Sequence, residues 1–185
     1  GGFERWVVGR AKAPSVRFGY ELAVLRMLAQ NRGVSLRKLL EPDAASAVLV
    51  AGLLNGNLGE IRKKALYLLN EGYRAVKLKV GRYPLADDIR TTLWLREHLG
   101  ETITLRLDGN RAWSLETAIA YAREVTKCFI EFIEEPLADP SRLDEFTAAL
   151  GTRIALDESL IDMAVDELHA TSHLAAVILK PTVLG

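Results

Sequence analysis

Cysteine is nearly absent from this sequence, with Cys128 as its single representative among 185 residues. One cysteine excludes an intramolecular disulfide framework. Because Cys128 stands just before an apolar run, we expect a buried structural thiol rather than a nucleophile. Histidine is also scarce: His98, His169 and His173 fall in predicted helices or loops, and none is in register with the acids at the strand ends. This placement argues against a zinc site.

An excess of charge of either sign is absent as well. The 24 Lys and Arg residues balance the 24 Asp and Glu residues, so no net field favours nucleic acid or an anionic membrane as a partner. No apolar run reaches the roughly 18 to 20 residues of a membrane-spanning helix, and the first residues lack the charged-then-apolar order of a signal peptide. We therefore expect a soluble, cytoplasmic protein that acts on a small molecule.

What the sequence does contain is a regular alternation of short strands with helices. Hydrophobic residues make up 49% of the chain, enough for a substantial core in one domain or part of one. The predicted strands are residues 48–53, 74–80, 103–108, 129–134, 153–157 and 175–180. The predicted helices are residues 58–71, 84–99, 114–127, 140–150 and 161–171. Such an alternation indicates βαβ units and a parallel sheet.

Two parallel-sheet architectures fit this alternation, an open doubly wound sheet and a (β/α) barrel. A dinucleotide-binding sheet requires Gly-x-Gly-x-x-Gly after its first strand, and the segment from Gly52 to Gly59 lacks that spacing. A barrel instead places functional side chains at the C-terminal ends of several strands, where this chain carries polar residues. We therefore predict an α/β fold in which residues 47–185 form an incomplete (β/α) barrel of about six βα units.

Residues 1–46 precede the predicted barrel and form an entry segment. Residues 1–13 show no convincing period and are expected to be irregular. A helix is predicted from Ser15 to Asn31, where Asn31-Arg32-Gly33 provides a stop. Residues 34–45 contain Pro42 and few patterned apolar positions, so we expect a connection there.

The predicted strand 103–108 has two chemically different faces and ends on a carboxylate. Its odd-numbered positions are aliphatic and its even-numbered positions polar, so Asp108 shares the polar face with Arg106. The predicted strand 74–80 repeats the pattern with Lys77 and Lys79. Alternating lysines usually mark a solvated face, but a parallel strand covered by helices has no such face. Both lysines are therefore expected to point into a polar site.

Two further predicted strands end in adjacent acids. In the strand 153–157, parity places Asp157 on the face opposite the aliphatic residues, so Asp157 is a better site candidate than Glu158. In the strand 129–134, parity is mixed, because apolar residues accompany the acids on both faces. The pattern alone therefore does not choose among Glu131, Glu134 and Glu135.

The spacing along the chain brings these residues into one predicted site. Each step from Lys79 to Asp108, Glu134, Asp157 and Lys180 is one βα unit of roughly 20 to 30 residues, which predicts equivalent strand ends for all five. Three converging carboxylates would repel one another without a cation. An all-oxygen donor set favours a hard ion, and Mg²⁺ keeps positions open for substrate oxygens. Beside such a cation, burial and a neighbouring ammonium disfavour a charged lysine, so Lys79 is a candidate base for a proton next to a carboxylate.

Several of these residues stand in recognisable short motifs. The motifs are Lys77-Leu-Lys79, Asp108, Glu134-Glu-Pro136, Asp157-Glu-Ser159 and Lys180-Pro181. Together they resemble the enolase superfamily, in the muconate-lactonizing-like subgroup with lysines on the second and sixth barrel strands. Within that subgroup, residues 79–81, 105–113 and 178–182 are most similar to enzymes that form o-succinylbenzoate by dehydration in menaquinone and phylloquinone synthesis. In epimerases of the subgroup, glutamine more often stands where this chain has Arg111.

The resemblance implies a role for each motif residue. Asp108, Glu134 and Asp157 would bind Mg²⁺, for which Mn²⁺ is a possible substitute. Lys79 would remove the proton next to the carboxylate of a small-molecule substrate and return it to the departing hydroxyl, and Lys180 would stabilise the enediolate. The substrate-side candidates are Lys77, Arg106 and Asn110, and Arg106 has an equal claim to be a structural partner of neighbouring acids.

The resemblance also implies parts that this sequence lacks. Family members carry an N-terminal capping domain and seventh and eighth barrel strands that hold further substrate contacts. We therefore expect this chain alone to have little or no activity. Two other interpretations stay open, namely a dipeptide epimerase or N-acylamino acid racemase of the same superfamily, and a non-catalytic fragment.

Overall fold

The computed structural model describes residues 13–161 and 163–184, which belong to two compact units. The larger unit is Val50–Ile178, and the smaller unit combines Gly1–Leu49 with Leu179–Gly185. The irregular segment predicted for residues 1–13 lies, apart from Ala13, outside the described residues.

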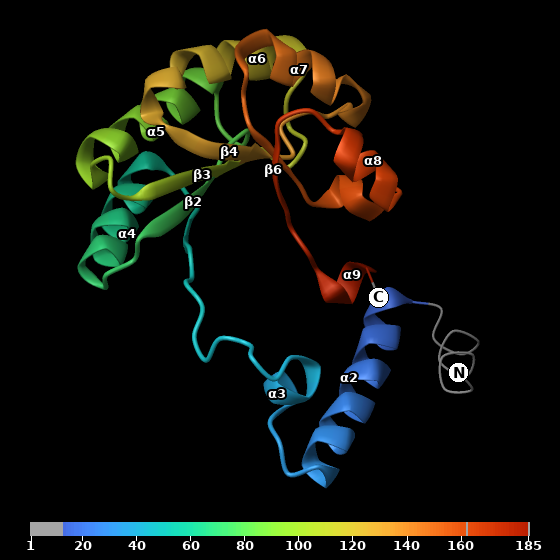
Figure 1. Cartoon of the computed structure of the whole chain (residues 1–185). Coiled ribbons are helices and arrows are strands. Elements are labelled where there is room, and N and C mark those ends of the chain that lie inside the picture. The colour runs from blue at the N-terminus through green and yellow to red at the C-terminus, as the bar shows by residue number, and fades with distance from the viewer. Residues whose placement is uncertain (1–12, 162, 185) are drawn as a thin grey trace. The chain divides into compact units, whose positions relative to one another are not determined.

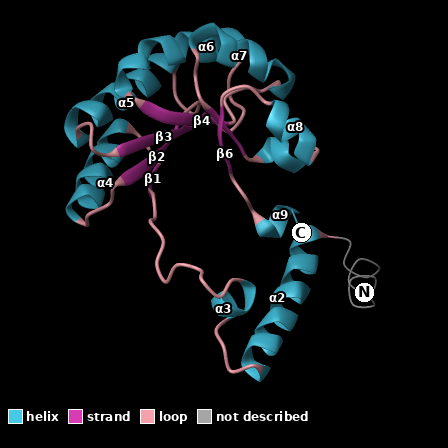
Figure 2. Ribbon diagram, viewed as in Figure 1, coloured by secondary structure: helices cyan, strands magenta, loops and turns pink. Residues whose placement is uncertain are grey.

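The larger unit is built on a six-stranded parallel sheet whose strands follow one another in chain order. The strands are β1 (Gly52–Leu54), β2 (Ala75–Lys79), β3 (Thr104–Asp108), β4 (Ile130–Glu134), β5 (Ile154–Leu156) and β6 (Leu174–Val177). The connecting helices are α4 (Leu58–Asn70), α5 (Leu85–Leu99), α6 (Leu115–Glu124), α7 (Leu143–Leu150) and α8 (Val165–Ala170). The sheet curves, and the helices from α4 to α7 cover its outer side (Figures 1 and 2). This is the arrangement of a (β/α) barrel, because a doubly wound sheet carries helices on both faces.

The two-faced strands are confirmed. On β2 and β3, alternate aliphatic residues are fully buried beneath the helices, whereas the polar residues between them are partly accessible on the other face, except the buried Asp108. The buried aliphatic residues are Val76, Leu78, Leu105 and Leu107. Burying each such side chain stabilises the fold by about 1.5 to 3 kcal/mol. The sequence pattern thus determines which face of the sheet carries the polar side chains of the candidate site.

The two edge strands are shorter than predicted. Val48, Leu49 and Val50 lie outside β1 and are 80%, 95% and 65% exposed. The register of β1 pairs Gly52 with Val76, so residues before Ala51 would lie opposite the turn that precedes β2. β6 ends at Val177 because its partner β5 ends at Leu156 and turns into a 3₁₀ helix.

Three helices form the described part of the smaller unit: α2 (Pro14–Asn31), α3 (Leu36–Leu40) and α9 (Pro181–Leu184). The predicted first helix is confirmed as α2. The connection predicted at residues 34–45 is wrong in part, because α3 lies within it and begins where the Ser35 hydroxyl caps the Lys38 N–H. A five-residue helix is too short to show a helical period. Among the helices at residues 13–161 and 163–184, none is both long and apolar enough to cross a membrane.

Candidate active site at the strand ends

Three of the predicted site residues lie side by side at the C-terminal ends of neighbouring strands. The register pairs Lys79 of β2 with Asp108 of β3, and Asp108 with Glu134 of β4, and we call these three residues the row. Asp108 and Glu134 are each 1% exposed. Two carboxylates buried this deeply on adjacent strands require positive charge nearby.

Lys77 and Lys79 supply that charge from the polar face of β2. Lys77 Nζ donates to both carboxylate oxygens of Glu134 at 2.9 Å and lies 2.9 Å from Asp108 Oδ2. Lys79 Nζ donates to Asp108 Oδ2 at 2.5 Å and to Asn110 Oδ1 at 2.6 Å. The expectation that both lysines point into a polar site is therefore confirmed, and Asn110 lies beside them.

The pKa values of the two carboxylates shift in opposite directions. Burial opposes ionisation of Asp108, but hydrogen bonds from Lys79 and Lys77 outweigh it and lower the pKa of Asp108. Burial raises the pKa of Glu134 to about 7, against the hydrogen bond from Lys77 and with the repulsion of Asp108. Burial lowers the pKa of Lys77, but its two carboxylate partners outweigh that effect and raise it overall. Near neutral pH, Asp108 therefore stays ionised, whereas Glu134 is near the midpoint of its titration.

The ambiguous parity of β4 has a structural cause. The register between β3 and β4 shifts between Leu105 and Leu107, which pair with Ile130 and Ile133 respectively. Two positions of β3 therefore span three positions of β4, a bulge that parity does not anticipate. Glu131 and Glu134 consequently both reach the polar face, where Glu131 accepts from Arg106 and Glu134 from Lys77.

Neither Asp157 nor Lys180 ends a strand, so the expectation of five equivalent strand ends is wrong for these two. Glu134 pairs with Ala155, and Ala155 pairs with Ala176. Asp157 is therefore two residues beyond the row, in the buried turn after β5. Lys180 lies past the end of β6, directly before α9, in the smaller unit. Chain spacing counts residues between strands, but it does not fix their register.

The carboxylates are the oxygen donors that a hard divalent cation prefers, although they do not converge on one point. Across residues 13–161 and 163–184, no three Asp, Glu, His or Cys side chains are grouped closely enough to hold a metal ion. The observation that fits a cation is the buried pair itself, because burial and, to a smaller extent, the charge of Asp108 raise the pKa of Glu134 to about 7. A divalent cation beside two oxygen donors would relieve both effects.

No role was assigned from the sequence to three side chains that hydrogen-bond to one another beside the row, namely Arg111, Glu135 and Ser159. The Glu135 carboxylate accepts from both of the others. The adjacent acids Glu134 and Glu135 were a visible signal, but the pattern gave no way to assign the second acid a partner.

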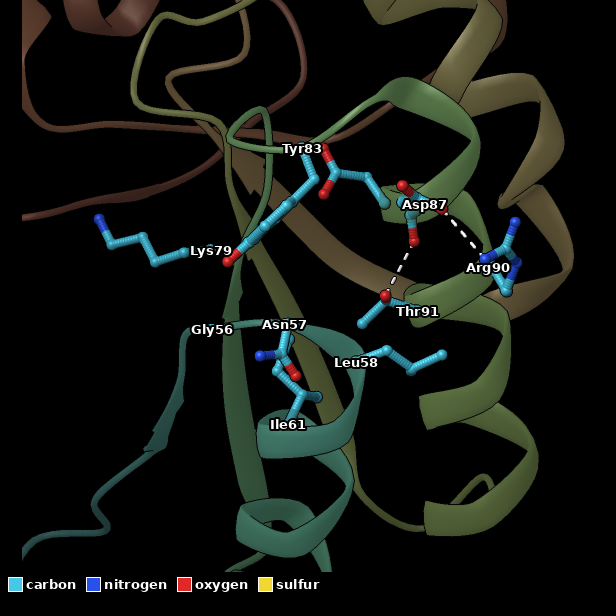
Figure 3. Close-up of a pocket in the computed structure, with 10 residues that line it drawn as sticks. Gly56, Asn57, Leu58, Ile61, Lys79, Tyr83, Asp87, Arg90 and Thr91 are labelled. Carbon is cyan, nitrogen blue, oxygen red and sulfur yellow. Dashed lines mark hydrogen bonds and ion pairs between the residues drawn. The ribbon is translucent and has the colours of Figure 1, made fainter.

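Lys79 also borders a cavity of about 220 Å³ on the helix side of β2. Figure 3 shows that Lys79 extends from the strand away from Asp87 and Arg90, which line the far wall on α5. The cavity therefore lies behind the row of charged groups rather than in front of the Lys79 ammonium.

Asp88 anchors the turn that follows Lys79. Its carboxylate accepts the Gly81 N–H at 2.7 Å and is 4% exposed. Gly81 adopts a φ of 79°, and a Cβ there would lie 2.5 Å from the Ala112 Cβ. Burial raises the pKa of Asp88 to about 6, with the Gly81 hydrogen bond acting against the shift.

We expect Asp88→Asn to stabilise the chain above pH 6. The Asp88 pKa is raised from 3.8 to about 6 in the folded state, so the free energy of unfolding falls as pH rises from about 4 to 6. The amide oxygen of asparagine still accepts the Gly81 N–H. The expected gain is about 1 to 3 kcal/mol at pH 8, disappearing near pH 4, as measured by urea unfolding.

Asp144→Asn is the matched control, because Asp144 also lies in the first turn of a helix but is exposed. The control is expected to change stability little across this range. Lower stability of Asp88→Asn at pH 8 would contradict the interpretation.

The sequence matches the model of a known family. Residues 60–183 match the family described as enolase C-terminal domain-like. The chain is also 34% identical over 181 residues to an o-succinylbenzoate synthase from Aliivibrio salmonicida, covering 95% of this chain and 50% of that protein.

Two solved structures illustrate that this fold is shared with known enzymes. A muconate cycloisomerase from Pseudomonas fluorescens superposes with a TM-score of 0.84 at 24% identity, covering 97% of this chain and 51% of that one. A dipeptide epimerase from Cytophaga hutchinsonii, complexed with Mg and the dipeptide D-Ala-L-Val, gives a TM-score of 0.79 at 24% identity over 91% of this chain and 47% of that one. The chain therefore spans about half the length of these proteins. The predicted fold class, part of a (β/α) barrel, is confirmed.

Proposed function

The chain belongs to the enolase C-terminal domain-like family, and on that basis we propose that the whole protein is a Mg²⁺-dependent lyase. The proposed reaction removes water from 2-succinyl-6-hydroxy-2,4-cyclohexadiene-1-carboxylate and yields o-succinylbenzoate. The observation that carries the proposal is the row of Lys79, Asp108 and Glu134 in one register at the strand ends. The similarity to an o-succinylbenzoate synthase over 95% of this chain supports the choice of reaction.

Lys79 is the proposed base. Its Nζ is held by Asp108 Oδ2 at 2.5 Å and by Asn110 Oδ1 at 2.6 Å, and it would take the proton from the ring carbon that bears the substrate carboxylate. The electron pair of that C–H bond enters the ring as the neighbouring C–O bond breaks. Lys79 then returns the proton to the departing hydroxyl, which leaves as water. Proton transfer by a positioned side chain typically contributes about 10² to 10⁴ in rate.

The remaining residues have supporting roles in the proposal. Asp108 and Glu134, with Asp157 from the turn after β5, would hold Mg²⁺. When bound, the cation stabilises negative charge that develops on the substrate carboxylate. Lys180 would stabilise the same charge as an ammonium. Lys77 is bonded to Glu134 and would bind a carboxylate oxygen of the substrate.

The contacts of Arg106 favour a structural role, whereas those of Asn110 favour a role close to the substrate. Arg106 donates to Glu131 and stacks over the Phe132 ring at 5.4 Å, which favours a structural pairing that keeps its charge on the polar face. Asn110 accepts from Lys79 and would orient the ammonium toward the substrate.

The test is to incubate the whole protein with the cyclohexadiene substrate and millimolar Mg²⁺, and to follow aromatic absorbance. We expect turnover in the ordinary enzyme range, about 1 to 10³ s⁻¹. The 185-residue chain is expected to turn over far more slowly, because β1 and β6 are open edges of its sheet. Equal turnover by the chain alone would contradict this expectation.

A second candidate is epimerisation of a dipeptide, which uses the same removal of a proton next to a carbonyl carbon. It is favoured by the likeness to a dipeptide epimerase from Enterococcus faecalis, which is 28% identical and superposes with a TM-score of 0.82 over 94% of this chain and 51% of that one. Incubating the whole protein with dipeptides in D₂O and following deuterium at the α-carbon separates the two. Dipeptide exchange without dehydration would replace the first proposal by the second.

A further inference from the structure

The carboxylate of Glu135, the residue directly after β4, accepts four hydrogen bonds. Its Oε1 accepts the Asp157 N–H at 2.8 Å and the Ser159 N–H at 2.7 Å. Its Oε2 accepts the Ser159 hydroxyl at 2.8 Å and Arg111 Nε at 3.1 Å. Arg111 Nη2 also donates to the Ser159 hydroxyl oxygen at 2.8 Å. We call Arg111, Glu135 and Ser159 the clasp.

The clasp joins the chain segments that follow three consecutive strands. Arg111 follows β3, Glu135 follows β4, and Ser159 follows β5. The Arg111 N–H also donates to the Glu135 carbonyl oxygen at 2.7 Å. Arg111 and Glu135 have φ angles of 58° and 40°, a region that side-chain-bearing residues enter at a cost of order 1 to 3 kcal/mol. Such backbone persists only where surrounding contacts hold it, and the clasp provides those contacts.

The segments that the clasp joins also carry the candidate carboxylates. Glu134 immediately precedes Glu135, and Asp157 donates its own N–H to the Glu135 carboxylate. Because Glu135 binds the N–H groups on both sides of Glu158, it fixes the backbone of the whole turn from Asp157 to Ser159. Glu135 is 1% exposed, so water does not compete for these bonds.

We propose that Glu135 is a positioning residue that sets the direction of the Asp157 carboxylate relative to Asp108 and Glu134, and thereby the affinity of the site for a divalent cation. The inference rests on the proposed function, which places a cation at these carboxylates. Strand register does not place Asp157, since Glu134 pairs with Ala155 two residues earlier. The turn after β5 therefore needs a separate constraint, and the clasp supplies it.

The test compares Mg²⁺ binding by the wild-type chain and by Glu135→Gln, using calorimetry, with Mn²⁺ electron paramagnetic resonance as a second probe. A glutamine amide retains one oxygen but places an N–H₂ group where the other accepted a hydrogen bond. We expect the Mg²⁺ dissociation constant to rise about 10- to 100-fold, as is typical when an outer partner of a metal ligand is removed. Amide hydrogen exchange at Asp157 and Ser159 is expected to accelerate in parallel.

Two further variants separate positioning from general loss of stability. Tyr121→Phe removes a buried hydroxyl that is 2.6 Å from the Thr92 hydroxyl, so it weakens the core away from the carboxylates and is expected to leave Mg²⁺ affinity unchanged. Ser159→Ala removes one donor to Glu135 and keeps the backbone bond. It is expected to raise the dissociation constant about threefold to tenfold, the effect of one hydrogen bond, and it carries the test if Glu135→Gln does not fold.

The outcomes distinguish the two levels of the proposal. Equal Mg²⁺ affinity in wild type, Glu135→Gln and Ser159→Ala would overturn the positioning role and leave the proposed function standing. A wild-type chain that binds no Mg²⁺ at millimolar concentration would overturn the proposed cation site and the positioning role with it. Weaker binding in Tyr121→Phe equal to that in the clasp variants would assign the effect to stability and also overturn the positioning role.

Discussion

Replacing Lys79 with alanine is expected to lower kcat for dehydration by about 10² to 10⁴, the usual contribution of a general base. Lys79 Nζ is the ammonium nearest Asp108, at 2.5 Å, and Asn110 holds it from the other side at 2.6 Å. Alanine lacks the Nζ atom, which in the proposed reaction carries the proton from the ring carbon to the departing hydroxyl. Because Lys77 still neutralises Glu134 and Asp108, Mg²⁺ and substrate binding should change much less than kcat.

The measurement is kcat and KM of the whole protein, together with exchange of the substrate's ring proton for deuterium in D₂O. Lys63→Ala is the matched control, since Lys63 is exposed on α4 and outside the row. Loss of deuterium exchange only in Lys79→Ala would identify the proton-transferring lysine. Wild-type kcat in that variant would refute the assignment.

The sequence predicts the faces of the strands well because one physical cause governs them. β2 and β3 are covered by helices on one side, so a period of two separates their buried aliphatic residues from polar ones, as Leu78 and Lys79 illustrate. The strand edges are harder, because an apolar run such as Val48 to Val50 looks like a strand whether or not a partner lies opposite. Pairing partners are a property of the assembled sheet.

The composition of the site is only partly predictable for a related reason. The bulge between β3 and β4 brings Glu131 and Glu134 to the same face, and nothing in the local sequence marks that extra residue. Asp157 was expected in the row, yet it lies two residues beyond Ala155. Glu135 was indistinguishable by pattern from Glu134, since the difference between them is the partner that each one meets.

Asp108→Asn is expected to weaken Mg²⁺ binding by about 100-fold or more, since cation affinity follows the number of charged ligands. Asp108 is buried, and two ammonium groups lower its pKa, so it is the carboxylate that remains charged across the working pH range. The matched control is Glu131→Gln, which neutralises an acid on the same face that is paired with Arg106. An equal loss of Mg²⁺ affinity in both variants would attribute the effect to the total negative charge on the polar face of the sheet and would contradict Asp108 as a ligand.

The pH dependence of Mg²⁺ binding separates Asp108 from Glu134. Burial and the Asp108 charge raise the pKa of Glu134 to about 7, so below pH 7 the cation must displace a proton from Glu134, and affinity should fall about tenfold per pH unit. In Asp108→Asn the repulsion from Asp108 is gone, which lowers the Glu134 pKa and moves the pH dependence toward acid. Calorimetry from pH 5.5 to 8, roughly the range that brackets this titration, measures both effects. Affinity independent of pH in the wild-type chain would exclude Glu134 as a ligand that titrates near neutrality.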